Sequence, residues 1–456
     1  MRRSLRGWRS ARAQRVPTAA AAPAGTPPFA VAFPYLQQQP LKIGVGLLAL
    51  TFYLWIIHSY KLPAVDVAVI GMALGVLVRG GTIRIPFPLA CFGILILWGC
   101  LGLAVTDDAG RTLDALIDLT KLWIIAFCVV NVVRTAADFR YLVIAWLAVF
   151  ALYPVRGALY NQYICHCTTL GRVTWNFVFG NPNDLAALTM VPLGLCAGVA
   201  TVERTKFFRM SALAGVVILS MIILLTQSRA AILGLGAAAL MLLFTSRRKV
   251  RDIGTLVVLL GAAIVFAPKK VWERVAGLAN VSVEADMQGV DPEASAESRW
   301  AIWQVAFKTI GGNPVTGIGA SMMPVRHAQE SSRENLRSTV RGEKDTHSTY
   351  IKLAAEMGIP ALILYLMMWG SVFRRVHRAR KSIATTRPKD HQMLFYLELA
   401  MTAYMVASIF GSYGAVSFTY LIVSVAWLAS DILGREPWYV SPQTAMKLQP
   451  QAVRGR

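Results

Sequence analysis

The chain has 456 residues, of which 55% are hydrophobic and 15% are charged, and its mean hydropathy is +0.51. Soluble domains carry about 25% charged residues, so this composition excludes an ordinary soluble protein. The formal net charge is +22, but the Lys and Arg residues occur in short groups along the chain and do not gather on one soluble face. This distribution argues against nucleic acid as a partner.

Apolar runs of helix length follow one another along most of the chain. A helix needs about 17–25 residues to cross a bilayer, and a spanning segment must pair its backbone polar groups internally. We therefore predict an all-α, polytopic membrane protein with about twelve transmembrane helices. The expected spans are 43–60, 62–78, 86–105, 115–133, 139–160, 184–202, 210–226, 229–245, 252–267, 354–373, 392–411 and 415–433.

These spans divide the chain into five parts. Residues 1–40 are basic and then rich in Ala and Pro, which predicts a cytoplasmic tail and not a cleaved signal peptide. Helices 1–9 occupy 41–267, a large loop occupies 268–353, helices 10–12 occupy 354–433, and 434–456 form a second tail. The basic connecting segments fall on one side, which the positive-inside rule makes cytoplasmic, together with both termini.

The opposite face, periplasmic in a cell with two membranes, receives the loop 161–183, the turn 226–229, the large loop and a turn near 411–414. Asn183 or Asp184 is expected to cap the helix that follows the first of these. The same loop holds Cys165-His166-Cys167. Two thiols and an imidazole are metal ligands, but a spacing of one residue without a second cluster favours a local loop feature or a disulfide to a cysteine elsewhere in the chain.

The large loop is predicted to hold an amphipathic helix. Trp300, Trp303, Phe307 and Ile310 recur at helical spacing, which is typical of a helix in the membrane–water interface. The turn residues of Gly312–Gly319 end it, and the polar strip from Arg326 to Asp345 is expected to be mobile.

Four arginines on this face are candidate ligands of a phosphate group: Arg156, Arg172, Arg229 and Arg299. Arginine within a span is costly, and Arg binds phosphate oxygens with two parallel hydrogen bonds. Snorkelling or contact with lipid headgroups is the alternative role for each of them.

His347 is the candidate catalytic residue, because a neutral imidazole can remove a proton near pH 7. A structural histidine is the alternative, and Glu356 is a hypothetical orienting partner. The acidic pairs Asp107-Asp108 and Glu284/Asp286 could hold a divalent cation, although solvated loop charge is the favoured interpretation.

The segment from about Arg172 to Leu366 resembles the O-antigen ligase and O-antigen polymerase superfamily. The resemblance rests on Gly180-Asn-Pro-Asn-Asp184, Thr226-Gln-Ser-Arg229, Ser298-Arg299 with Trp303, Asn313–Gly319, and His347-Ser-Thr-Tyr-Ile351 followed by Glu356-Met-Gly-Ile-Pro360. Many members carry Asn after the His, where this chain has Ser348.

The resemblance implies a membrane glycosyltransferase of the bacterial inner membrane with its active site on the periplasmic side. It implies transfer of a glycan from undecaprenyl diphosphate to the lipid A–core oligosaccharide, without a metal or cofactor. His347 would be the base, and Arg229, Arg299, Arg156 and Arg172 would bind the diphosphate. Alternatives are a polymerase of O-antigen or exopolysaccharide repeat units, a protein O-oligosaccharyltransferase, and a transporter of lipid-linked glycans or anions.

Overall fold

The computed structural model describes residues 40–59, 64–245, 296–333 and 341–438. The described chain is helical, without a strand. Its first half contains α2 (Pro40–Ser59), α3 (Val65–Arg79), α4 (Phe87–Gly99) with η2 (Cys100–Ala104), α5 (Ala109–Val132), α6 (Ala136–Phe150), the π-helical η3 (Ala151–Val155), α7 (Arg156–Tyr163), η4 (Phe177–Phe179), α8 (Pro182–Val202), α9 (Lys206–Leu225) and α10 (Arg229–Thr245).

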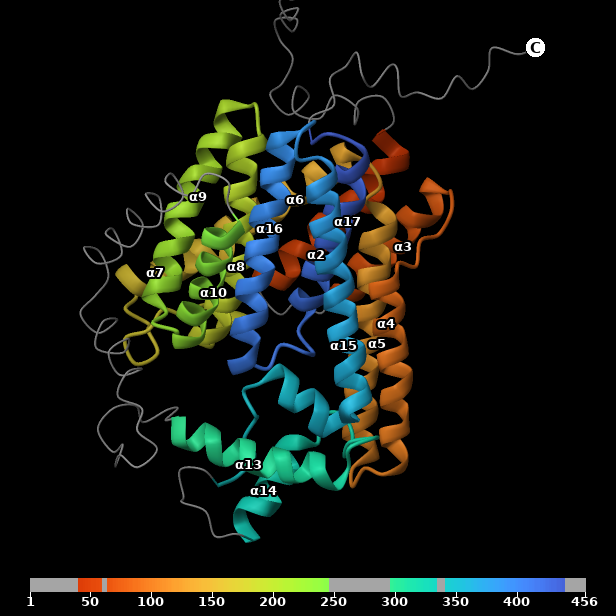
Figure 1. Cartoon of the computed structure of the whole chain (residues 1–456), viewed down its shortest axis with the longest axis vertical. Coiled ribbons are helices and arrows are strands. Elements are labelled where there is room, and N and C mark those ends of the chain that lie inside the picture. The colour runs from red at the N-terminus through yellow and green to blue at the C-terminus, as the bar shows by residue number, and fades with distance from the viewer. Residues whose placement is uncertain (1–39, 60–63, 246–295, 334–340, 439–456) are drawn as a thin grey trace, which may run out of the picture.

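The second half contains α13 (Ala296–Gly312), α14 (Met323–Arg333), α15 (Thr349–Ser382), α16 (Pro388–Ala407), η5 (Ser408–Phe410) and α17 (Ser417–Arg435). Most helices run along one axis in a bundle, while α13 and α14 lie across its lower end (Figure 1). The prediction of a helical, polytopic membrane protein is confirmed.

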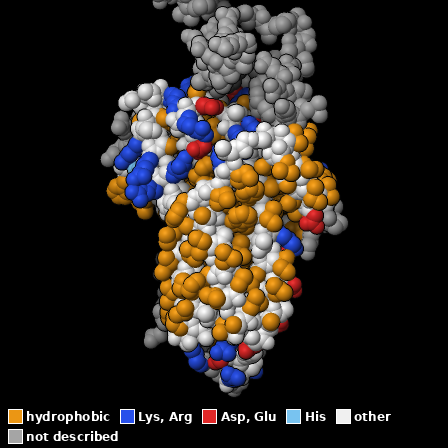
Figure 2. All heavy atoms as spheres, turned by 90° about the vertical axis from the view of Figure 1, so that its right-hand side faces the viewer, with side chains coloured by type: hydrophobic (Ala, Val, Ile, Leu, Met, Phe, Trp, Pro, Cys, Tyr) orange, Lys and Arg blue, Asp and Glu red, His pale blue; other side chains and the backbone are white. Residues whose placement is uncertain are grey.

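Eight helices of the described ranges are long and apolar enough to cross a membrane. They are α4–η2, α5, the continuous α6–α7, α8, α9, α15, α16–η5 and α17. The expected spans 43–60, 62–78 and 229–245 coincide with the shorter α2, α3 and α10, and the span 252–267 lies outside the described residues. On the face that Figure 2 draws, apolar side chains cover the middle of the bundle, and most charged side chains lie toward its two ends.

Small residues bring neighbouring helices into contact. A Cβ atom on Gly75 of α3 would lie 2.3 Å from the Cα of Gly46 in α2. A Cβ on Gly234 of α10 would lie 2.4 Å from the carbonyl oxygen of Ala403 in α16. Within a bilayer, helices associate through such close packing and not through a hydrophobic driving force.

The amphipathic helix of the large loop is present as α13. Its buried face is made by Ile302, Val305 and Ala306, while Trp300 and Phe307 are about half exposed. The aromatic side chains of the predicted apolar face therefore point in two directions: Trp303 turns toward α15, whereas Trp300 and Phe307 face outward. The strip after Arg326 is helical as far as Arg333, where Glu330 links α14 to α13 through Lys308 (3.2 Å).

Candidate active site

A kink in α15 shapes the end of the bundle where α13 and α14 lie. Gly358 has φ 81° and ψ 169°, a conformation open essentially to glycine alone, so the helix changes direction there. The loop from Asn313 to Gly319 binds the kink: Ile359 N donates to Pro314 O (2.8 Å) and Gly319 N to Glu356 O (2.9 Å). The turn-rich stretch after α13 therefore fixes the direction of the first two turns of α15 (Figure 1).

His347 lies two residues before α15 begins, with a left-handed backbone (φ 47°) and an exposed side chain. Its neighbours Thr346 and Ser348 are buried. Trp303 of α13 donates its indole N–H to Thr346 O (2.8 Å), and the Thr349 hydroxyl donates to Gly411 O (2.6 Å). The backbone on both sides of His347 is thus held, and the imidazole stays accessible.

The surroundings lower the pKa of His347 below its usual 6.5. Desolvation by the surrounding protein is the main cause, the nearby cations of Arg299, Lys352 and Lys344 lower the pKa further, and Asp345 opposes them. Asp345 is itself paired with Lys352 (3.1 Å). The lowered pKa keeps the imidazole of His347 neutral at pH 7.

Tyr413 links three of the segments at this end of the bundle. Its backbone N–H donates to the Thr349 hydroxyl (2.8 Å), and its phenol donates to Asn183 O (3.3 Å). The phenol also hydrogen-bonds the carboxyl of Asp184. Burial raises the pKa of Tyr413, and the charge of Arg299 opposes this.

Arg172 joins the loop 161–183 to the turn between α9 and α10. Its buried guanidinium donates through Nε to Thr226 O (2.9 Å) and through Nη2 to the side-chain oxygen of Asn183 (2.8 Å). The cap of α8 is Asn181, which accepts from Asn183 N (2.8 Å), so the expectation that Asn183 or Asp184 caps this helix is wrong. Their side chains are directed instead to Arg172 and Tyr413.

Arg229 begins α10 and is half buried. Its side chain forms neither a hydrogen bond nor an ion pair with any residue that the structure describes. Arg156 is exposed on α7 and donates to Leu152 O of the preceding turn (3.0 Å). Hydrogen bonds of the described chain link Arg172 through Asn183 and Tyr413 to Thr349, two residues from His347, and Arg229 lies three residues from Thr226. Arg299 acts on His347 and Tyr413 through its charge. None of these contacts involves Arg156.

Other hypotheses from the sequence are corrected. Glu356 does not orient His347: it is buried, accepts from Met323 N (3.2 Å) and faces Lys352 (3.9 Å), so it fixes the loop around the kink. Cys165 and Cys167 form a disulfide with each other. Asp108 caps α5 by accepting from Arg111 N (2.9 Å), and the pair Glu284/Asp286 lies outside the described residues.

Sequence reasoning missed Tyr413, Asp345 and Lys352 as members of this site. Lys352 stands in the first turn of a membrane-entering helix, four residues before Glu356. This pair of opposite charges at the start of a transmembrane helix could have pointed to Lys352 as a member of the site. Tyr413 lies in a short turn and gave no such signal.

Comparison with known families agrees with this geometry. A family model described as O-antigen ligase (Wzy_C) matches residues 214–366, about a third of the chain, and no curated protein matches the chain significantly. The matched segment runs from α9 through α10, α13 and α14 to the kinked part of α15, and it contains Arg229, Arg299 and His347. Over this segment the chain is similar to the O-antigen ligase family, and together with the apolar helices the match supports a membrane protein that acts in glycan transfer.

Proposed function

We propose that this protein is an O-antigen ligase that transfers a glycan from undecaprenyl diphosphate to a hydroxyl of the lipid A–core oligosaccharide. Transfer takes place at the periplasmic face of the bacterial inner membrane. The proposal is supported by one observation above the others: His347, Arg299 and the Arg172–Asn183–Tyr413 network converge at one end of the bundle.

The acceptor hydroxyl oxygen attacks the anomeric carbon of the glycan. The bond between that carbon and the diphosphate oxygen breaks, and undecaprenyl diphosphate leaves with the bonding electrons. His347 accepts the hydroxyl proton, for which its lowered pKa keeps it in the neutral form. A single displacement from the opposite side of the leaving group inverts the anomeric configuration.

Arginine supplies charge to the leaving group. A diphosphate leaves readily only when its growing negative charge is neutralised, and groups already in place stabilise it best. Arg229 is suited to this task because no described residue occupies its donors, and Arg299 lies beside the base. Arg172 has its donors engaged with the protein, so we assign it to positioning the α9–α10 turn, which carries Arg229.

The test is transfer by the purified protein in lipid vesicles, with an undecaprenyl-diphosphate glycan as donor and either core lipid or a second donor molecule as acceptor. Product on core lipid supports a ligase. Product only on the second donor would replace it by a repeat-unit polymerase, and no product with either would overturn glycan transfer from this donor. Activity is expected to persist in EDTA; its loss, restored by a divalent cation, would show that a metal takes part.

A further inference from the structure

The end of the bundle opposite to the candidate active site carries a second group of arginines. There α4 begins and α15 and α17 end (Figure 1). Two adjoining cavities with volumes of about 750 and 500 Å³ open at this end and share Pro86, Trp427, Asp431 and Arg435. We propose that they form a binding site for the headgroup of an anionic phospholipid with two phosphates, of the cardiolipin type.

Charge is the first argument. The described residues that line the two cavities include six arginines but a single carboxylate, Asp431; the arginines are Arg84, Arg134, Arg374, Arg375, Arg378 and Arg435. Asp431 already pairs with Arg375 (2.6 Å), Arg435 (2.5 Å) and Arg84 (3.5 Å). Arg374 and Arg378 are exposed and have no ion-pair partner within the described part of the chain. The pocket therefore holds a surplus of positive charge.

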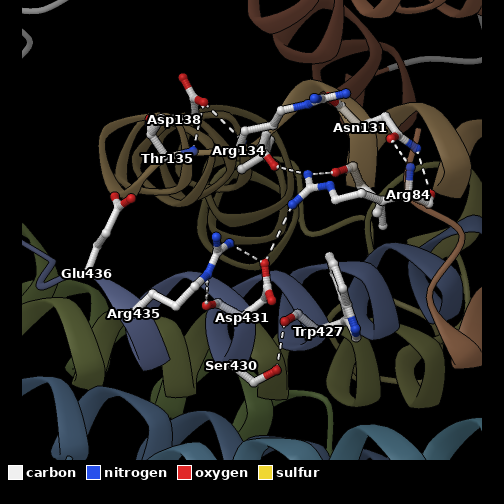
Figure 3. Close-up of polar contacts among 12 residues, drawn as sticks. Arg84, Asn131, Arg134, Thr135, Asp138, Trp427, Ser430, Asp431, Arg435 and Glu436 are labelled. Atoms are coloured by element: carbon white, nitrogen blue, oxygen red, sulfur yellow. Dashed lines mark hydrogen bonds and ion pairs between the residues drawn. The ribbon is translucent and has the colours of Figure 1, made fainter. Parts of the chain in front are cut away.

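The guanidinium groups are also held in place. Arg84 and Arg375 lie over the ring of Trp427, with centroid distances of 5.4 and 5.3 Å. Figure 3 shows Asp431 between Arg84 and Arg435, with Trp427 beside them. Arginines that only orient the protein by the positive-inside rule would not need to be held against Trp427 and Asp431 in this way. A preformed pocket loses less entropy when an anion binds.

Repulsion among the arginines is not relieved by the protein itself. Burial lowers the pKa of Arg84 to about 10; Asp431 opposes this, and the neighbouring Arg134, Arg435 and Arg79 lower the pKa further. Arg84 Nε and one Nη of Arg134 are buried without a hydrogen-bond acceptor from the described residues. Phosphate oxygens at the accessible donors of this cluster would offset that repulsion.

The position of the pocket favours a lipid over a free anion. Pro86, Phe87 and Pro88, where α4 enters the apolar belt, line the larger cavity. Ile83, Ile85 and Phe87 are exposed by 63%, 58% and 55%, so the mouth lies against acyl chains and not in open solvent. Basic pockets between transmembrane helices on the cytoplasmic side are suited to cardiolipin headgroups, and two adjoining cavities suit two linked phosphates.

The test measures the melting temperature of the full-length protein in detergent with added cardiolipin, phosphatidylglycerol at equal phosphate, phosphatidylethanolamine, or inorganic phosphate. Arg374→Gln/Arg378→Gln removes two pocket cations without breaking an ion pair of the described chain. Lys206→Gln/Arg209→Gln is the matched control, because it removes two exposed cations from the same end of the bundle outside the pocket.

We expect cardiolipin to raise the melting temperature of the wild type and of the control more than phosphatidylglycerol does, and the pocket variant to lose most of that rise. Phosphatidylethanolamine and inorganic phosphate should produce no rise. The proposal is overturned if cardiolipin has no effect on the wild type, or if both double variants lose it equally. It is also overturned if phosphatidylglycerol or inorganic phosphate is as effective as cardiolipin.

Discussion

His347 gains its chemical role from its surroundings. A base must be neutral to accept a proton, and desolvation and neighbouring cations lower the pKa of His347 below 6.5. The rate of transfer should therefore fall as the imidazole becomes protonated, with the midpoint of this acid limb below pH 6.5. The pH–rate profile of kcat between pH 5 and 8 measures this limb, and a midpoint above pH 6.5 would contradict it.

Replacement of the imidazole tests the same role directly. His347→Ala should lower kcat by about 10²–10⁴-fold, the usual contribution of a positioned base, and should abolish the acid limb. His166→Ala is a matched control, because His166 is also exposed and also has a left-handed backbone (φ 55°). Equal activity of the two variants would remove His347 from the mechanism.

Arg229 is the arginine of the site whose geometry matters most. A guanidinium holds two phosphate oxygens in a planar fork, whereas the ammonium of Lys is a point charge. Arg229→Lys should therefore lose most of the transfer activity, measured as kcat/KM for the lipid-linked donor, without loss of melting temperature. Arg209→Lys on the neighbouring α9 is the control; full activity of both variants would favour a snorkelling role for Arg229.

At the scale of the elements, the shape of α15 depends on one glycine. A Cβ atom on Gly358 would lie 2.0 Å from the carbonyl oxygen of Val315, and the backbone conformation alone costs about 1–3 kcal/mol for other residues. Gly358→Ala should lower the melting temperature and the transfer activity together, because straightening α15 would disturb the hydrogen bonds of Thr346 with Trp303 and of Thr349 with Gly411 on either side of His347.

Gly370 offers a control within the same helix. A Cβ there would meet nothing within 4 Å, and Ala in a helix interior is favoured over Gly by about 0.5–1 kcal/mol. Gly370→Ala should keep or raise the melting temperature and leave transfer unchanged. An unchanged melting temperature in Gly358→Ala would show that the kink does not depend on the glycine.

Elements with strong local signals were predictable from the sequence. A run of about 20 apolar residues has few alternatives to a spanning helix, so α4, α5, α8 and α16 lie where they were expected. The π-helical turn η3 within the continuous α6–α7 was not predicted, although it contains Pro154, which lacks the N–H that a regular α-helix needs. The helix α14 was missed because its polar sequence lacks an apolar run, while its contact with α13 through Glu330 joins residues far apart in the sequence.

At the scale of the whole molecule, the sequence predicted that four segments share one face but not how they meet. The contacts Arg172–Asn183 and Tyr413–Thr349 join residues that no local periodicity connects. Likewise, Arg84 and Asp431 are brought together only by the packing of α4 and α17. The candidate base and arginines could be named from residue type, whereas their supporting residues required the fold.

The orientation of the bundle remains a prediction from its charges. The basic segments put the ends of α15 and α17 in the cytoplasm and α14 in the periplasm. Both cysteine variants are made with Cys100→Ser, which removes the exposed cysteine among the described free thiols. Ser332→Cys on α14 should then react with an impermeant maleimide in cells whose outer membrane is permeabilised. Ser382→Cys at the end of α15, also exposed, should react only after the inner membrane is opened. The reverse pattern would put the candidate active site in the cytoplasm, away from its proposed acceptor.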